Sequence, residues 1–281
     1  MYKRQVPHRP LVDKLANLGL DAHALSWITS YLTNRKQHVV VGGESSLDTP
    51  VLTGVPQGSV LGPLLFLVYI DDVSDVLLSD GSTLNLYADD MLLYKPVKSI
   101  EDIHHLQMDI DCISEWVSCN KLTLNPTKCK TMVISRKRNS VQPYAQFVLN
   151  GRPLEQVETF KYLGILLSSD LSWSAHIESI CTKARKLIGL LYRRFYGNID
   201  DHSLLELYSV LVRPHLEYAA PVWDPHLTKD TNKLESVQKF ALKMCLKQWD
   251  LGYHDLLDLS QFPTLENRRL YLKLCTRNEV I

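Results

Sequence analysis

The segment LNLYADDMLLYK, Leu84 to Lys95, places two adjacent carboxylates between two apolar runs. Apolar residues alternate with other residues on both sides of the pair, and Pro96 ends the second run. This pattern predicts a strand, a turn and a second strand, with Asp89 and Asp90 at the tip of the hairpin. Carboxylates held rigidly on a hairpin suit Mg²⁺, which prefers hard oxygen ligands when it also binds substrate phosphates. Taken alone, an Asp pair is more typical of an ordinary polar turn.

The composition predicts a folded, soluble protein. The chain has 281 residues, of which 45% are hydrophobic, enough for a buried core. Its 31 Lys and Arg balance its 31 Asp and Glu, so contacts with nucleic acid would have to come from local basic clusters. These clusters, with two tyrosines that could stack on bases, are Arg136, Lys137 and Arg138; Lys183, Arg185 and Lys186; and Arg193 and Arg194 with Tyr192 and Tyr196. A solvated helix face is the competing interpretation.

Cysteine spacing and hydropathy indicate the compartment. The six cysteines form no Cys-x-x-Cys pair, which argues against a zinc module or a secreted disulfide framework and favours a reducing, intracellular compartment. The longest apolar run, Val60 to Ile70, is too short to span a bilayer, and the first residues do not have the form of a signal peptide. We expect no membrane role.

Periodicity predicts an α+β fold in two regions. Helical spacing before Gly19 and after Asp21 predicts two helices, and GVPQGSVLGPLLFLVYIDD predicts a helix that starts between Ser59 and Pro63. Strands are expected in HVVVGG, DTPVLTG, KLTL, KTMVIS and ETFKYLGILLSS, a helix after a Ser99 cap, and a hairpin at Asn150-Gly151. Beyond Asp170 only helical periods remain, with a helix from Leu204 to Val212 that ends before Pro214 and a last helix after Thr264. A mixed region, 6–170, is therefore expected to precede an all-α region, 171–281.

The order and spacing of several motifs resemble the reverse transcriptases of non-LTR (LINE-type) retrotransposons. GVPQGSVLGPLLFLVYIDD, followed by YADD, resembles two palm motifs, and LTLNPTKCK and FKYLGILL resemble the next motif and the primer-grip hairpin. LYSVLVRPHLEYAAPVW, LESVQKFALKM and TLENRRL resemble the helical region that follows. The resemblance covers the chain from Val6 onward. It implies an antiparallel polymerase palm sheet packed with helices and followed by a thumb-like helical region.

The resemblance also implies roles for individual residues. Asp89 is expected to bind Mg²⁺, with Asp90 as a supporting ligand, and Lys128 to lie near the incoming triphosphate. The nucleotide- or template-binding loop is expected to comprise Gly54, Pro56, Gln57, Gly58 and Ser59, and the primer grip Tyr162, Leu163 and Gly164. Plainer interpretations remain open: a helix cap at Ser59, a solvated Lys128, and core positions for Tyr162 and Leu163. The implied partners are an RNA template, a DNA primer and a deoxynucleoside triphosphate.

The first residues depart from the family pattern. The first catalytic aspartate is expected about eight residues before Val6, so the fingers and the first catalytic motif are expected to lie outside this chain. MYKRQ matches the translation of a transposase end sequence used in library adapters, so we interpret Met1 to Gln5 as non-native. Because both metal ions share the expected aspartate, we expect the chain alone to be inactive.

Three functional readings are open at this point. The first is a fragment of an RNA-directed DNA polymerase that works, in its parent, by two-metal transfer to a primer 3′ hydroxyl within a nuclear or cytoplasmic ribonucleoprotein. The second is a non-catalytic remnant that binds nucleic acid. The third is a maturase or an RNA-dependent RNA polymerase, which share the palm.

Overall fold

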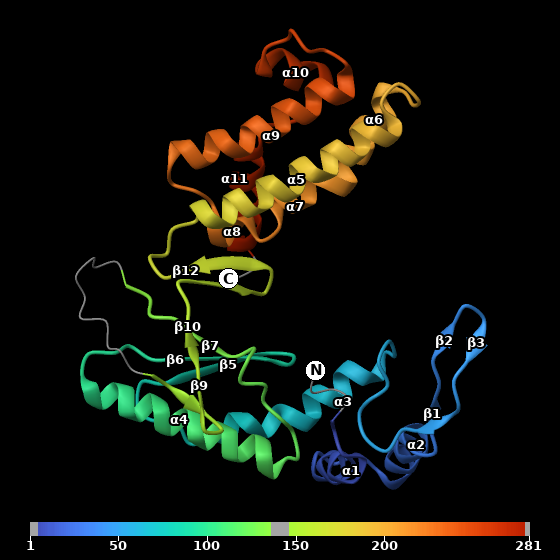
Figure 1. Cartoon of the computed structure of the whole chain (residues 1–281), viewed down its shortest axis with the longest axis vertical. Coiled ribbons are helices and arrows are strands. Elements are labelled where there is room, and N and C mark those ends of the chain that lie inside the picture. Colours follow the sequence, from blue (N-terminus) through green and yellow to red (C-terminus); the bar gives the residue numbers. More distant parts are fainter. Residues whose placement is uncertain (1–4, 136–145, 279–281) are drawn as a thin grey trace. The chain divides into compact units, whose positions relative to one another are not determined.

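The computed structural model describes residues 5–135 and 146–278, and Figure 1 shows how their helices and strands follow one another. Helices are combined with short two-stranded sheets, which confirms the α+β class. The chain divides into two compact units: Met1–Thr131 with Val141–Gln156, and Met132–Ser140 with Val157–Ile281. The boundary expected near residue 170 stays a prediction. Among the described residues, no helix is both long and apolar enough to cross a membrane.

The first unit begins with two helices whose ends were predicted. Helix α1 (His8–Asn17) stops before Gly19, which has φ +88° and so adopts a conformation that glycine takes without steric cost. Helix α2 (Ala22–Leu32) begins after Asp21, whose Oδ1 accepts a 2.8 Å hydrogen bond from the Ala24 amide. An Asp at this position satisfies one of the amides that the first turn leaves unpaired.

Helix α3 (Leu61–Ile70) begins within the predicted interval and is apolar on all sides. Its inner face buries Leu65, Phe66 and Tyr69 in a core shared with α1, α2 and α4 (Ile100–Cys119). A short 3₁₀ turn, η2 (Asp71–Asp75), follows α3. Ser99 caps α4 as predicted, in a reciprocal arrangement with Asp102.

Lys14 ties three helices of the first unit together. Its Nζ donates to the Tyr69 carbonyl at 2.7 Å, to Asp72 Oδ1 at 2.7 Å and to Asn120 Oδ1 at 2.8 Å. The Tyr69 carbonyl lies at the end of α3, where the last carbonyls have no helical partner, whereas Asp72 in η2 and Asn120 after α4 accept through their side chains. Burial and the nearby Asp72 charge raise the pKa of Tyr69 to about 12, so its hydroxyl stays protonated and donates to the Asn120 carbonyl at 2.6 Å.

The sheets of the first unit are small and separate. Strands β1 (Lys36–Gln37) and β4 (Thr49–Pro50) pair around β2 (Val40–Val41) and β3 (Glu44–Ser45), β5 (Thr83–Tyr87) pairs with β6 (Asp90–Tyr94), and β8 (Val148–Leu149) pairs with β9 (Arg152–Pro153). These pairs are antiparallel, whereas β7 (Lys130–Thr131) runs parallel to β10 (Glu155–Gln156). The predicted hairpin at Asn150-Gly151 is confirmed, with φ of +51° and +73° at the two loop residues. The described strands do not join into one continuous sheet.

Two predicted strands are corrected by the structure. KLTL is not a strand, because Lys121 has φ +54° and the Leu122 amide donates to the Val117 carbonyl, so these residues end α4 instead. Asn125 then accepts hydrogen bonds from the amide and hydroxyl of Thr127, which makes a turn. KTMVIS is reduced to the two residues of β7.

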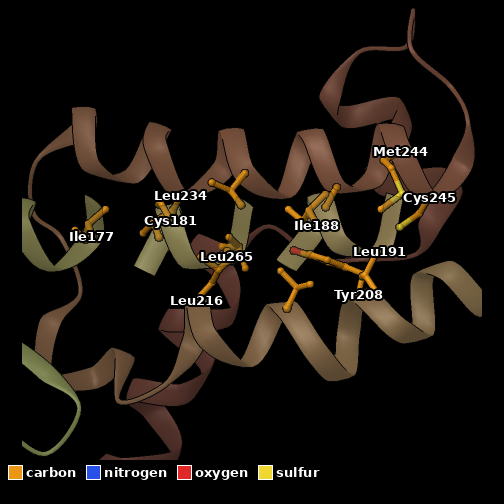
Figure 2. Packing of buried hydrophobic residues seen from close by; sticks show 14 of the residues in the cluster. Ile177, Cys181, Ile188, Leu191, Tyr208, Leu216, Leu234, Met244, Cys245 and Leu265 are labelled. Carbon is orange, nitrogen blue, oxygen red and sulfur yellow. The ribbon is translucent and has the colours of Figure 1, made fainter. Parts of the chain in front are cut away.

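The second unit is a hairpin followed by helices. Strands β11 (Thr159–Tyr162) and β12 (Ile165–Ser168) pair where one strand had been predicted. The helical elements are α5 (Ser174–Phe195), α6 (Asp201–Leu207), η3 (Tyr208–Val212), α7 (Arg213–Glu217), α8 (Ala220–Trp223), α9 (Thr228–Leu246), α10 (Tyr253–Ser260) and α11 (Leu265–Asn278). Figure 2 shows the core between α5 and α9, where Ile188, Leu234 and Met244 are fully buried. The last helix, predicted to follow Thr264, is confirmed, since α11 begins at Leu265.

The helix predicted to end before Pro214 continues through it. Proline lacks an amide proton, and its ring collides with the carbonyl four residues earlier in a regular α-helix. The chain avoids that collision by widening into a π-helical turn, η3, immediately before α7, where Pro214 occupies the first turn. The wider turn keeps Tyr208 and Val212 in the core.

Candidate active site

Hairpin β5–β6 carries the carboxylate pair, as the sequence predicted. Tyr87 pairs with Asp90, which leaves Ala88 and Asp89 as a two-residue loop. Ala88 has φ +52°, a left-handed conformation that costs a residue with a Cβ about 1–2 kcal/mol. Asp89 is half-buried and Asp90 is exposed. Backbone strain beside two carboxylates is typical of a site whose geometry the surrounding structure imposes.

Asp89 and the glycine-rich loop line one pocket. The pocket has a volume of about 350 Å³, and its other lining residues are Val55, Pro56, Gln57, Gly58, Gly62 and Pro63. The structure thus brings together two segments that are some 30 residues apart in the sequence. Of the predicted loop residues, Pro56, Gln57 and Gly58 line the pocket, whereas Gly54 and Ser59 do not.

Ser59 shapes the loop from behind. Its Oγ donates to the Pro56 carbonyl at 2.7 Å and accepts from the Gly62 amide at 3.0 Å, so it closes the loop and satisfies an amide in the first turn of α3. A Cβ on Gly62 would lie 2.4 Å from the Pro56 oxygen, far inside van der Waals contact. Gly62 is therefore a residue that the sequence analysis missed, and it allows the close approach of helix and loop.

Gly54 anchors the loop to the start of the described chain. Its amide donates to the Val6 carbonyl at 2.7 Å, and its own carbonyl is 2.9 Å from His8 Nε2. An antiparallel bridge between Pro7 and Thr53 lies beside these bonds. Gly54 is buried with φ +93°, a conformation that glycine adopts without steric cost, and its predicted contact with a nucleotide or template stays a prediction.

Asp109 fixes the segment that leads into β5. Its Oδ1 accepts hydrogen bonds of 2.7 Å from the amide and the hydroxyl of Ser79, and its Oδ2 accepts one of 2.5 Å from Ser82 Oγ. Burial raises the pKa of Asp109, but the hydrogen bonds from Ser82 and Ser79 and the Lys95 charge outweigh this and leave it below the ordinary value. The signal in the sequence was an acid beside the apolar stripe of α4.

Lys128 is not part of the pocket. It is exposed at the end of a turn in which its amide donates to the Asn125 carbonyl at 3.0 Å. The pocket that holds Asp89 does not include it.

The carboxylates present suit Mg²⁺ in kind but not in number. Asp89 and Asp90 offer hard oxygen donors, which is what the ion prefers. However, residues 5–135 and 146–278 contain no group of three or more His, Cys, Asp or Glu side chains placed to hold a metal ion. A two-metal site needs further ligands to bind both ions.

The predicted primer-grip residues lie at the tip of hairpin β11–β12 in the second unit. Leu163 and Gly164 connect the strands with φ of +46° and +85°. Tyr218 Oη donates to the Leu163 carbonyl at 3.0 Å, and a Cβ on Gly164 would lie 3.0 Å from the Tyr218 ring. Tyr218 therefore clamps this loop, a contact between positions far apart in the sequence. Tyr162 is half-buried at the end of β11.

The basic clusters fall partly within the structure. Lys183, Arg185 and Lys186, like Arg193 and Arg194, are exposed on α5. Arg136, Lys137 and Arg138 lie outside the described residues.

Comparison with known proteins assigns the chain to a family. The model of the reverse transcriptase (RNA-dependent DNA polymerase) family matches residues 4–167. The RNA-directed DNA polymerase from mobile element jockey of Drosophila funebris is 29% identical over 90% of this chain and 28% of its own length. A probable RNA-directed DNA polymerase from transposon X-element of Drosophila melanogaster is 29% identical over 84% of this chain and 27% of its own length.

The same relationship extends to a further element. A putative 115 kDa protein in the type-1 retrotransposable element R1DM of Drosophila melanogaster is 28% identical over 84% of this chain and 23% of its own length. The chain thus spans about a quarter of the length of these relatives. On the extent of the family match and the identity of these relatives, the chain belongs to the reverse transcriptases of non-LTR retrotransposons.

Proposed function

We propose that the chain contains palm and thumb portions of an RNA-directed DNA polymerase, with the catalytic carboxylates on hairpin β5–β6. The observation that carries this proposal is the pocket in which Asp89 meets Pro56, Gln57 and Gly58. A carboxylate beside a loop of exposed backbone suits a substrate that carries both a metal-bound phosphate and a sugar or base. The parent enzyme copies an RNA template from the 3′ hydroxyl of a DNA primer, using deoxynucleoside triphosphates.

The carboxylates and the loop divide the work. Asp89 and Asp90 hold Mg²⁺, which supplies charge stabilisation for nucleotidyl transfer when bound. Gln57 offers an exposed amide to a nucleotide or template strand, and Gly58, with φ +75°, lets the backbone approach that strand closely. Ser59 and Gly54 act indirectly, because they hold the loop in this shape.

Two further contacts are proposed with the primer and the triphosphate. The Tyr162–Gly164 loop positions the primer terminus, and Tyr218 keeps that loop in its conformation. Lys128 neutralises charge on the triphosphate or protonates the leaving pyrophosphate in the parent enzyme. Its exposure leaves it accessible to such a ligand.

We also propose that the 281-residue chain alone does not extend a primer. The described residues hold no group in which a third His, Cys, Asp or Glu side chain joins Asp89 and Asp90 to complete a two-metal site. The assay uses an RNA template, an annealed DNA primer, deoxynucleotides and Mg²⁺. No incorporation is expected, and sustained incorporation by the chain would overturn this proposal.

A chimera tests the site itself. The chimera joins the part of the Drosophila funebris jockey polymerase that precedes the position aligned with Val6 to residues 6–281 of this chain. We expect this chimera to extend the primer. Asp89→Asn should then abolish extension, because it removes a charged metal ligand without changing side-chain size. Asp80→Asn is the matched control, since Asp80 is an exposed acid just before the same hairpin. Equal extension by the Asp89→Asn chimera and the parent chimera would contradict the assignment.

A second function is favoured by the incomplete ligand set. A chain that cannot complete the metal site can still bind nucleic acid through the pocket loop and the exposed cations of α5. Two results together would favour this role over catalysis. The 281-residue chain would bind a primer–template, and the folded chimera would not extend the primer.

A further inference from the structure

A run of aromatic rings, three of them exposed and Tyr196 half-buried, lies toward the C-terminal ends of α5 and α9. The run consists of Tyr192 and Tyr196 from α5, Phe240 from α9, and Trp249 just after α9, and we call it the aromatic platform. Tyr192, Phe240 and Trp249 are 44%, 45% and 42% exposed. Helices α5 and α9 run side by side in Figure 1, which brings these residues to one end of the second unit.

The rings contact one another in sequence. The Tyr192 and Tyr196 ring centroids are 4.5 Å apart, and the Trp249 indole lies within 3.5 Å of the Tyr196 hydroxyl, to which it donates a hydrogen bond. The Phe240 and Trp249 centroids are 6.1 Å apart. Apolar side chains on a helix exterior are usually isolated from one another, so three exposed rings connected through the half-buried Tyr196 form an unusual surface.

Cations frame the platform. Lys243 Nζ donates to the Trp249 carbonyl, a neutral acceptor that leaves its charge uncompensated. Arg193 lies between the two tyrosines in sequence and forms no ion pair with any described residue. Lys247 is neutralised by Asp201 at 2.8 Å and so adds little. An acidic residue is also close in sequence, since Asp250 follows Trp249 directly.

We propose that the aromatic platform binds an unpaired stretch of RNA, with bases stacked on Tyr192, Tyr196 and Trp249 and phosphates near Arg193 and Lys243. Aromatic faces accept any base, and stacking requires bases that are not paired in a duplex. Positive charge beside the rings complements the phosphates, whereas an apolar protein partner would gain nothing from it. The choice of RNA over DNA rests on the proposed function, because an RNA-directed polymerase handles its template as a single strand.

Fluorescence anisotropy with labelled oligouridine RNA of about 12 nucleotides tests the platform on the full chain. Trp249→Leu and Tyr192→Leu are each expected to weaken binding about tenfold, since each removes one stacking surface but keeps apolar bulk. Tyr271→Leu is the matched control, because Tyr271 is 59% exposed on α11 and makes no ring contact with the platform. It should bind as the unsubstituted chain does. Melting curves followed by circular dichroism verify that each variant is folded.

Salt dependence separates stacking from charge. Arg193→Gln is expected to lower the slope of log affinity against log salt by about 0.7, the contribution of one phosphate on a single strand. Trp249→Leu should shift affinity without changing that slope. Folded Trp249→Leu and Tyr192→Leu variants that bind oligouridine as tightly as the parent would overturn the proposal, and so would tighter binding to the matching single-stranded DNA. Because no primer extension is measured, failure here is distinguishable from failure of the proposed polymerase function.

Discussion

Asp109 on α4 accepts a 2.5 Å hydrogen bond from Ser82 Oγ, one residue before β5 begins. The side chain of Asp109 is almost fully buried, at 2% exposure, and its other oxygen binds Ser79. Since β5 leads directly to the loop with Asp89, this carboxylate fixes the start of the hairpin against α4. Rigid support of this kind is what a metal-binding carboxylate pair requires.

Replacing Asp109 with Asn should destabilise the first unit. The amide keeps the size of the side chain and one acceptor oxygen, but the NH₂ group that replaces the other oxygen cannot accept from a serine, so the bonds from Ser79 or the bond from Ser82 are lost at a cost of about 1–3 kcal/mol. Urea unfolding monitored by circular dichroism measures the change. Glu115→Gln is the matched control, because Glu115 is exposed on the same helix, and it should change stability little. Equal stability of the two variants would show that the Asp109 contacts contribute nothing.

Stability should fall in acid through the same group. The folded-state pKa of Asp109 lies below the ordinary value of 3.8, so the unfolded chain takes up the proton more readily than the folded chain does. The stabilisation is therefore fully present above about pH 4 and is lost as pH falls through the folded-state pKa. Unfolding free energies measured across this range should show a smaller acid loss in Asp109→Asn than in the parent chain. Parallel curves for the two proteins would contradict this.

The hairpin at Asn150-Gly151 and two helix caps could be predicted from sequence because their signals are local. Asp21, Ser99 and Asn150-Gly151 act within a few residues, and each is found where the pattern placed it. The KLTL segment could not be predicted, because its alternation suits a strand while the end of α4 captures the Leu122 amide.

The contacts that shape the candidate site are non-local, which is why the sequence did not reveal them. Asp109 meets Ser79 across 30 positions, and Tyr218 meets Leu163 across 55. Gly62 lies within the quoted segment GVPQGSVLGPLLFLVYIDD, but the reason that only glycine fits there depends on where the Pro56 carbonyl points. The helix likewise continues past Pro214 only because the turn before it is widened, and hydrophobic periodicity does not predict such a turn.

Gly62→Ala should distort the pocket loop. The added methyl group would lie 2.4 Å from the Pro56 oxygen, so either α3 or the loop must move, at a cost of about 1–3 kcal/mol. Gly189→Ala is the matched control on α5, since its methyl group would meet only the flexible end of Arg193 at 3.5 Å. That control should stabilise the chain by about 0.5–1 kcal/mol. Thermal unfolding of both variants gives the comparison, and a stabilised Gly62→Ala variant would refute the close approach.

Ala88→Gly should relieve strain at the hairpin tip. Ala88 has φ +52°, which glycine adopts without the cost of about 1–2 kcal/mol that a Cβ brings. Part of this gain is offset because glycine makes the unfolded chain more flexible, so we expect stability to rise by up to about 1 kcal/mol. Ala16→Gly, at an exposed position of helix α1, is the matched control and should lower stability by about 1 kcal/mol. The two substitutions therefore have opposite expected signs in the same unfolding assay. If Ala88→Gly destabilised the chain as Ala16→Gly does, the alanine at the tip would not be strained, and the carboxylates beside it would not be held by an imposed geometry.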